Sequence, residues 1–348
     1  MPWTKIKPEI DEPDFYNAEG EGRIISYSEA VREGLQQAMA LDPNVFVMGQ
    51  GVDDPGGMFG TTKDLHKEFG GKRVFDTPLS ESALTGIALG AALSGMRPVY
   101  FHNRPDFLML AMDQLVNHAA KWHYMFGGAV CVPLVIWACI GRGWGSAAQH
   151  SQALQGLFMH VPGLKLIMPS TCFDAKGLLL ASIKDDNPVV ILDHRYNFRQ
   201  KGVVPKEAYT LPIGKGVIWK QGKDVTIVAI SHLVLETFHA AQELENEGVE
   251  AEVIDPRTLC PLDKELILRS VAKTGRLVVV DTGWKTCGVA GEIAALTAEK
   301  AFRSLKAPIA RVTCPDIPTP AGYTLEGAFY VGKEDIKRAV LKTMRYCE

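Results

Sequence analysis

The feature that most constrains the fold is an alternation that runs along almost the whole chain. Short, continuous apolar runs of strand length are separated by longer segments in which apolar residues recur with the period of a helix. The runs 132–140, "VPLVIWACI", and 276–281, "RLVVVD", show the pattern in the two halves. Strands that are apolar throughout are typical of parallel sheets covered on both faces by helices, so the sequence predicts an α/β fold.

The first half of the chain predicts strands and helices in turn. A helix expected at 26–41 begins with Ser26 three residues before Glu29, the spacing of a capping box. The other helices of this half are expected at 84–95, 106–126 and 170–186, and its strands at 44–49, 97–101, 132–140, 164–169 and 188–193. After a polar, proline-bearing stretch, further strands are expected at 224–231, 249–255, 276–281 and 309–314.

This pattern predicts two parallel-sheet α/β domains. The length of 348 residues suits two domains of ordinary size. The expected boundaries are an N-terminal arm at 1–22, a first domain at 23–200, a linker at 201–212 and a second domain at 213–348.

Composition excludes several classes of function. The net charge of −3 comes without a basic block, so neither nucleic acid nor an anionic membrane is expected as a partner. The longest apolar stretch contains a proline and is shorter than the ~20 residues that span a bilayer, and the N-terminus has no apolar signal core. Seven cysteines form no CxxC pair, which disfavours a structural metal site and predicts a reduced, cytoplasmic location.

Three loops follow predicted strands, at the edge where open α/β sheets bind ligands. The loop 49–62 is rich in glycine but lacks the known phosphate-binding patterns, which favours a flexible loop. The loop 76–86 places Glu81 just before an apolar helix, where an acid is also favoured by the helix dipole alone. The loop 140–152 joins a glycine-rich run to His150, which on local grounds is a solvated loop histidine.

Six blocks of the chain, in order, resemble one known family. They are 73–99, 111–128, 147–154, 161–179, 185–194 and 252–263, and the fourth, for example, reads "VPGLKLIMPSTCFDAKGLL". The family is the beta subunit of the thiamin-diphosphate-dependent 2-oxoacid dehydrogenases, the decarboxylating components for pyruvate, branched-chain oxoacids and acetoin. The resemblance implies an oxidoreductase with a transketolase-like pyrimidine-binding domain followed by a transketolase-like C-terminal domain.

The resemblance also implies site residues. Glu81, in "LSES", would share a proton with a ring nitrogen of the cofactor's aminopyrimidine, and Phe107 would pack on that ring. His150, in "QHSQ", would face the reactive end of the cofactor and exchange protons there. Gln50 stands at a cofactor-side position where the family usually has an acid, so a proton relay through it is in doubt.

The chain lacks the "GDG" run with which the family holds magnesium and diphosphate. The resemblance therefore implies an alpha subunit that holds Mg²⁺ and completes the site in a two-alpha, two-beta heterotetramer. It also implies a lipoyl acyltransferase core as the acceptor of the acyl group from a small 2-oxoacid. A structural K⁺ is implied at Leu134, Ser182, Asp185 and Asn187, with an ordinary Asx turn as the equal alternative.

Two segments depart from the family pattern and bear on the substrate. These segments contain His102, Arg104, Arg142 and Trp144. Arginines bind carboxylates well, which would suit a more anionic substrate. An equal alternative is that they are surface arginines that pair with nearby acidic side chains. Two other functions stay open on the sequence. One is half of a two-chain transketolase-like enzyme that passes a ketol or acyl unit to an aldehyde, and the other is a non-catalytic regulatory subunit.

Overall fold

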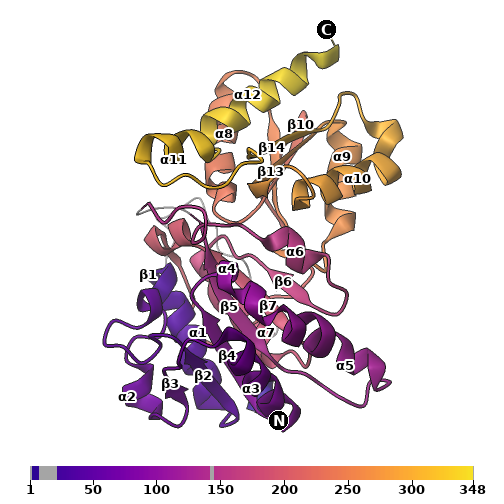
Figure 1. The fold of residues 1–348 in the computed structure, drawn as a ribbon. Helices are drawn as coiled ribbons and strands as arrows, with labels where there is room; N and C mark the ends of the chain where they lie inside the picture. Colours follow the sequence, from indigo (N-terminus) through magenta and orange to yellow (C-terminus); the bar gives the residue numbers. More distant parts are fainter. Residues whose placement is uncertain (1, 8–21, 142–144, 348) are drawn as a thin grey trace. The chain divides into compact units, whose positions relative to one another are not determined.

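The chain forms two units, each built around its own sheet (Figure 1). The computed structural model describes residues 2–7, 22–141 and 145–347. One unit contains residues 1–140 and 158–213, and the other contains 141–157 and 214–348. Both are α/β units rich in parallel strands, which confirms the predicted fold class. The exact domain boundaries remain a prediction.

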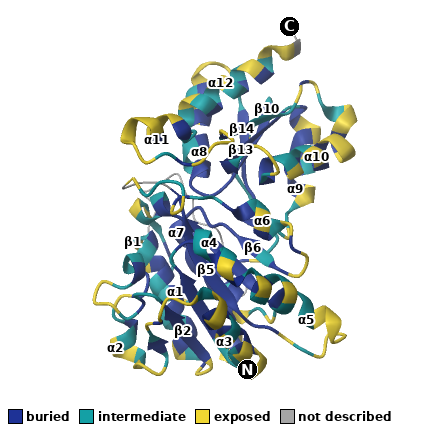
Figure 2. Ribbon diagram, viewed as in Figure 1, coloured by how far each residue is buried: buried dark blue, intermediate teal, exposed yellow. Residues whose placement is uncertain are grey.

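In the first unit, parallel strands pair in the order β6-β7-β5-β4-β2-β3. Their bounds are β2 Val45–Gly49, β3 Val74–Phe75, β4 Arg97–His102, β5 Val135–Ile140, β6 Lys165–Ile167 and β7 Val189–His194. Nearly all of their residues are buried (Figure 2), as the unbroken apolar runs predict. A short antiparallel pair joins β1 Ile24–Ser26 to β8 Lys201–Val203.

Side chains of the strands alternate between the two faces of this sheet. Val99 and Phe101 of β4 belong to the core that also contains side chains of α1 and α7, whereas Tyr100 and His102 point the other way, where α3 packs on β4. The capping box of Ser26 and Glu29 begins α1 as predicted. The helices of this unit are α1 Tyr27–Leu41, α2 Leu65–Phe69, α3 Glu81–Leu93, α4 Pro105–Leu108, α5 Ala120–Met125 and α7 Cys172–Lys184.

The single helix predicted at 106–126 is not continuous. It divides into α4, the 3-10 turn η3 Met109–Ala111, the π-helix η4 Asp113–Ala119, and α5. At the end of η4 the backbone N of Ala120 bonds to the carbonyl of Leu115, five residues earlier. Apolar spacing does not report such local changes of hydrogen-bond pattern, so the sequence predicted only the helical path. The remaining 3-10 turns of the unit are η1 Pro2–Lys5, η2 Met58–Gly60 and η5 Arg195–Arg199.

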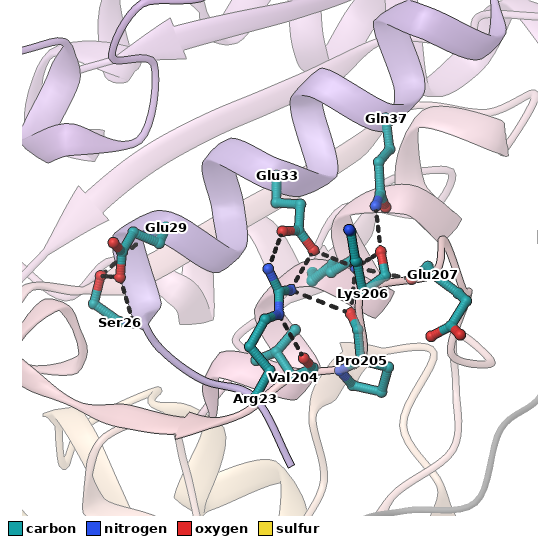
Figure 3. A network of polar contacts seen from close by, with 10 residues as sticks. Arg23, Ser26, Glu29, Glu33, Gln37, Val204, Pro205, Lys206 and Glu207 are labelled. Carbon is teal, nitrogen blue, oxygen red and sulfur yellow. Dashed lines mark hydrogen bonds and ion pairs between the residues drawn. The ribbon is translucent and has the colours of Figure 1, made fainter.

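A buried cation ties the segment 204–207 to this unit, beside the pair of Arg23 and Glu33 that Figure 3 shows. Lys176 of α7 has a fully buried side chain, and its Nζ donates to Glu33 Oε1 of α1 at 2.6 Å. The same ammonium donates to the carbonyl oxygens of Pro205 at 2.7 Å and Glu207 at 2.8 Å. Arg23 pairs with Glu33 from the other side, through two hydrogen bonds of 2.6 and 2.7 Å. Residues 204–207, within the predicted linker, therefore pack against the first unit.

In the second unit the strands pair in the order β14-β13-β10-β11-β9, and β9 alone of these runs antiparallel to its neighbour. The strands of this sheet are β9 Val217–Lys220, β10 Val225–Ala229, β11 Ala251–Asp255, β13 Leu277–Trp284 and β14 Ala310–Cys314. The short strand β12 Thr258–Cys260 also belongs to this unit but not to this sheet. The helices are α8 Leu233–Asn246, α9 Lys264–Thr274, α10 Val289–Ala301, α11 Tyr323–Phe329 and α12 Lys333–Met344, with 3-10 turns η6 Phe302–Ser304 and η7 Arg345–Cys347. Helix α6 Gln155–Met159 spans the division between the units.

None of the helices in the described residues is long and apolar enough to cross a membrane.

Candidate active site

A small pocket of the first unit lies where β2 and β4 end and α3 begins. The two strands are parallel neighbours, with Gly49 opposite Phe101, so the residues that follow them meet at one edge of the sheet. The pocket is lined by Gln50, Glu81, Tyr100, Phe101, His102, Asn103, Arg104 and Phe107. Five residues singled out from the sequence therefore share one pocket: Gln50, Glu81, His102, Arg104 and Phe107.

Glu81 is the first residue of α3, where the helix dipole favours a negative charge. The preceding Ser80 makes no side-chain cap, and Glu81 itself is partly exposed. Burial, and then the charge of Glu81, raise the pKa of Tyr100 to about 12. A neutral tyrosine hydroxyl therefore lies near a carboxylate that remains accessible to a ligand.

His102 forms a buried wall of the pocket. Its ring centroid lies 4.1 Å from that of Tyr100, and its Nε2 is 3.2 Å from the Thr85 hydroxyl of α3. Burial lowers the pKa of His102 to about 3. The imidazole is therefore neutral near pH 7 and offers hydrogen bonds rather than a positive charge.

Asn103 is a pocket residue that the sequence reasoning missed. Its Nδ2 donates to Gln50 Oε1 at 3.2 Å, which joins the ends of β4 and β2 through two neutral amides. Asn103 stands between His102 and Arg104 in a segment that departs from the family pattern. This position in the sequence could have indicated that Asn103 lines the pocket. The pairing makes this side of the pocket polar without adding charge.

Arg104 and Phe107 close the pocket from the start of α4. Arg104 is buried, and its Nη1 donates to the carbonyl of Cys139 in β5 at 3.2 Å. Part of this guanidinium is therefore committed to the backbone. Phe107 is half-buried and presents an aromatic side chain to the pocket.

His150 belongs to the second unit, whereas Glu81 belongs to the first. His150 is exposed, and its backbone N bonds to the carbonyl of Ala147 at 3.4 Å, which closes a turn. Ala147 has a φ of 59°, in the left-handed region that is uncommon for a residue with a side chain. The other two predicted substrate residues, Arg142 and Trp144, lie outside the described residues.

A buried carboxylate anchors the segment that follows His150. Gln155 Nε2 donates to Asp281 Oδ1 in β13 at 2.7 Å. Asp281 also accepts from the backbone N of Gly283 at 3.0 Å and of Ala290, at the start of α10, at 3.3 Å. Burial raises the pKa of this carboxyl group, and these donors oppose the rise. The segment after the His150 loop is thereby attached to β13 and, through Asp281, to the start of α10 in its own unit.

The turn predicted to hold potassium is an Asx turn, the alternative that the sequence left open. Asp185 Oδ1 accepts from the backbone N of Asn187 at 2.9 Å and from its Nδ2 at 3.2 Å. Asp185 Oδ2 accepts from Lys165 Nζ. A monovalent cation fits poorly at this carboxylate, because it would lie against the positive charge of the Lys165 ammonium that already pairs with Asp185.

Models of two protein families match the chain. The pyrimidine binding domain of transketolase matches residues 23–201, and the C-terminal domain of transketolase matches residues 214–336. A solved structure named as a split gene transketolase, an inactive beta4 tetramer, is similar in fold, with a TM-score of 0.74, 23% identity, and coverage of 93% of this chain and 99% of that one.

Curated relatives are closer in sequence. The beta subunits of acetoin:2,6-dichlorophenolindophenol oxidoreductase from Cupriavidus necator and Bacillus subtilis are 44% and 42% identical. They match 93% and 92% of this chain, and 98% of each relative is covered. The 2-oxoisovalerate dehydrogenase subunit beta of Bacillus subtilis is 40% identical, over 91% of this chain and 98% of the relative. The chain therefore belongs to the transketolase-like family of beta subunits of thiamin-diphosphate-dependent 2-oxoacid and acetoin dehydrogenases.

Proposed function

We propose that this chain is the beta half of a two-chain decarboxylating dehydrogenase component and that Glu81 activates its thiamin diphosphate. The observation that carries the proposal is the pocket at the start of α3. It combines one accessible carboxylate with an aromatic side chain, Phe107, and otherwise mostly neutral polar groups. This set suits the flat, nitrogen-bearing pyrimidine end of the cofactor.

In this mechanism each residue has a separate task. Glu81 shares a proton with a pyrimidine nitrogen, and Phe107 packs against the ring and fixes its plane. Thiamin diphosphate, when bound, supplies a nucleophilic carbon and an electron sink for the decarboxylation. Gln50, held by Asn103, hydrogen-bonds on the cofactor side but carries no proton of its own to release near neutral pH.

A partner subunit is part of the proposal. Apolar side chains on and beside α3 and η3 are exposed, with Leu79 at 79%, Ile87 at 60% and Leu110 at 63%. Grouped exposed apolar residues mark protein interfaces. The described residues contain no group of three or more His, Cys, Asp or Glu side chains that would hold a metal ion. We therefore assign Mg²⁺ and the diphosphate to an alpha subunit. The proposed assembly contains two alpha and two beta subunits and works in the cytoplasm, and the proposed acceptor of the acyl group is a lipoyl acyltransferase.

The donor in the proposal is a small 2-oxoacid. His102, neutral and buried, and Arg104, partly committed to the backbone, line the side where the donor would bind. Acetoin is a second candidate donor, because beta subunits named for acetoin oxidation are 44% and 42% identical to this chain. Arg142 and Trp144 remain predicted substrate contacts.

The proposal is tested by comparing the chain alone with the chain co-expressed with its alpha-type partner. The chain alone should reduce no 2,6-dichlorophenolindophenol with pyruvate, a branched-chain 2-oxoacid or acetoin, because half of the cofactor site is missing. The assembled pair should do so with one of these donors. Tight, magnesium-dependent binding of thiamin diphosphate by the chain alone, measured by calorimetry, would show that the half-site assignment is wrong. Activity only with a sugar ketol donor and an aldehyde acceptor would favour the transketolase-like alternative.

His150 is proposed to act at the reactive end of the cofactor. In the assembled enzyme, His150→Ala should leave cofactor affinity and hydrogen–deuterium exchange at the thiazolium carbon nearly intact. It should lower decarboxylation or acyl transfer by about 10²-fold or more, because an imidazole can both donate and accept a proton and so can serve those proton transfers. Comparing an artificial electron acceptor with lipoyl separates the two steps.

The matched control is His160→Ala, which removes an exposed histidine of the first unit. This variant should turn over normally. If the His150 variant also folds, assembles and turns over normally with both acceptors, His150 is only a solvated loop residue.

A further inference from the structure

The backbone oxygens expected to bind potassium at the 185–188 turn already accept hydrogen bonds within the chain. The carbonyl of Leu134 accepts from the backbone N of Val189 at 2.9 Å, and the carbonyl of Ser182 accepts from the backbone N of Asp185 at 3.3 Å. Both carboxylate oxygens of Asp185 also accept hydrogen bonds, from Asn187 and from Lys165. Three of the four residues expected to bind potassium, Leu134, Ser182 and Asp185, therefore each have an oxygen that accepts a hydrogen bond within the chain. The side-chain amide of the fourth, Asn187, instead donates to Asp185.

A guanidinium group binds the adjoining end of α7. Arg97 Nη1 lies 3.0, 3.2 and 3.1 Å from the carbonyl oxygens of Ile183, Lys184 and Asp185. Its Nη2 lies 2.6 Å from Asp186 Oδ1. The last carbonyls of a helix lack intrahelical donors and carry partial negative charge, which a cation stabilises. Arg97 meets this need without a bound ion.

The lysine that reaches Asp185 is fixed beside the turn by its own strand. The backbone N of Lys165 bonds to the carbonyl of Pro188 at 3.1 Å, and Lys165 pairs with Val189 in the register of β6 and β7. The side chain of Asp185 is only 15% exposed and that of Lys165 is 29% exposed, so water screens their attraction weakly. A potassium ion at Asp185 would have to displace this ammonium or lie against it at a repulsive distance.

We infer that Lys165 is a tethered cation that takes the place of a potassium ion at this turn, so that the fold of this subunit does not depend on potassium. An ammonium group and K⁺ carry the same charge, and the covalent tether removes the need to capture a free ion. The inference concerns the stability of the chain and holds whether or not the proposed catalytic function is correct.

The test is thermal unfolding of the full chain, freed of potassium by dialysis and measured in KCl, NaCl and choline chloride at equal ionic strength. The native sequence should unfold at the same temperature in all three salts. Lys165→Met, which keeps an unbranched side chain but removes the charge, should unfold at least about 3 °C lower in choline chloride. KCl should recover a large part of that loss, because the charge of Asp185 is then no longer neutralised by Lys165 and its Oδ2 is free to bind the ion.

Lys184→Met is the matched control, since Lys184 is an exposed lysine at the end of α7, next to the same turn. It should show no selective response to potassium. Three results would overturn the inference: stabilisation of the native chain by KCl alone, a Lys165→Met variant as stable as the native chain, or a destabilised variant that potassium does not rescue. If the variant fails to fold, elemental analysis of the dialysed native chain decides, because about one potassium per chain would contradict the inference and a negligible content would support it.

Discussion

Glu81→Gln should reduce activation of bound thiamin diphosphate by about 10²–10⁴-fold in the assembled enzyme, which is the usual contribution of one positioned proton-transfer group. The amide keeps the size of the side chain but cannot share a proton with the pyrimidine nitrogen. The direct measurement is hydrogen–deuterium exchange at the thiazolium carbon, which precedes any step with substrate. Overall turnover should fall in parallel.

The control for this variant is Glu292→Gln. Glu292 is also an acid in the first turn of a helix, α10, but it is exposed and does not line the pocket at the start of α3. Both substitutions remove a charge that the helix dipole favours, worth about 0.3–1 kcal/mol at the surface. If both variants lose a similarly small amount of stability and keep the hydrogen–deuterium exchange rate at the thiazolium carbon unchanged, Glu81 only stabilises the start of its helix.

Lys176→Met should lower the free energy of unfolding of the first unit by about 3–5 kcal/mol, the usual cost of removing one partner of a buried ion pair. The side chain of Lys176 is fully buried, and its ammonium binds Glu33 and the carbonyls of Pro205 and Glu207. Methionine fills much of the same volume but leaves those oxygens without this donor. Urea denaturation followed by tryptophan fluorescence measures the loss.

Arg23 limits the loss of stability expected for the Lys176 variant. Arg23 keeps both of its hydrogen bonds to Glu33 in the variant, so the carboxylate is not left alone and the loss should lie near the lower end of the range. Lys206→Met is the control, because the side chain of Lys206 is exposed and its backbone carbonyl remains in place. A Lys176 variant as stable as this control would mean that the buried ammonium contributes no net stability.

Local patterns in the sequence were sufficient where neighbours in the chain decide the structure. The capping box of Ser26 and Glu29 is present, and the apolar runs are buried strands of two sheets. Where the pattern was short or uniform, it said less. Strand β9 Val217–Lys220 was not predicted, because a four-residue antiparallel edge strand has little periodicity, and the helix expected at 106–126 contains a π-helical segment.

The candidate site divides in the same way. The resemblance to the family was enough to single out Glu81, Phe107 and, as a departure from the family pattern, Gln50, and these residues line one pocket. It did not indicate Asn103, nor that burial would make His102 neutral. Hydrogen-bond partners and desolvation depend on residues from other helices and strands, so the local sequence cannot predict them.

The sequence by itself determined the fold class and the family, because unbroken apolar strands require covered parallel sheets and six ordered blocks are a specific signature. Only the tertiary structure decided which charges stabilise it. Lys176 meets Glu33 across 143 residues of sequence, and Lys165 meets Asp185 across 20. In the sequence each is one lysine among many. Their burial and partners arise when the helices and strands pack, because the free energy of a charge depends on the water and the dipoles around it.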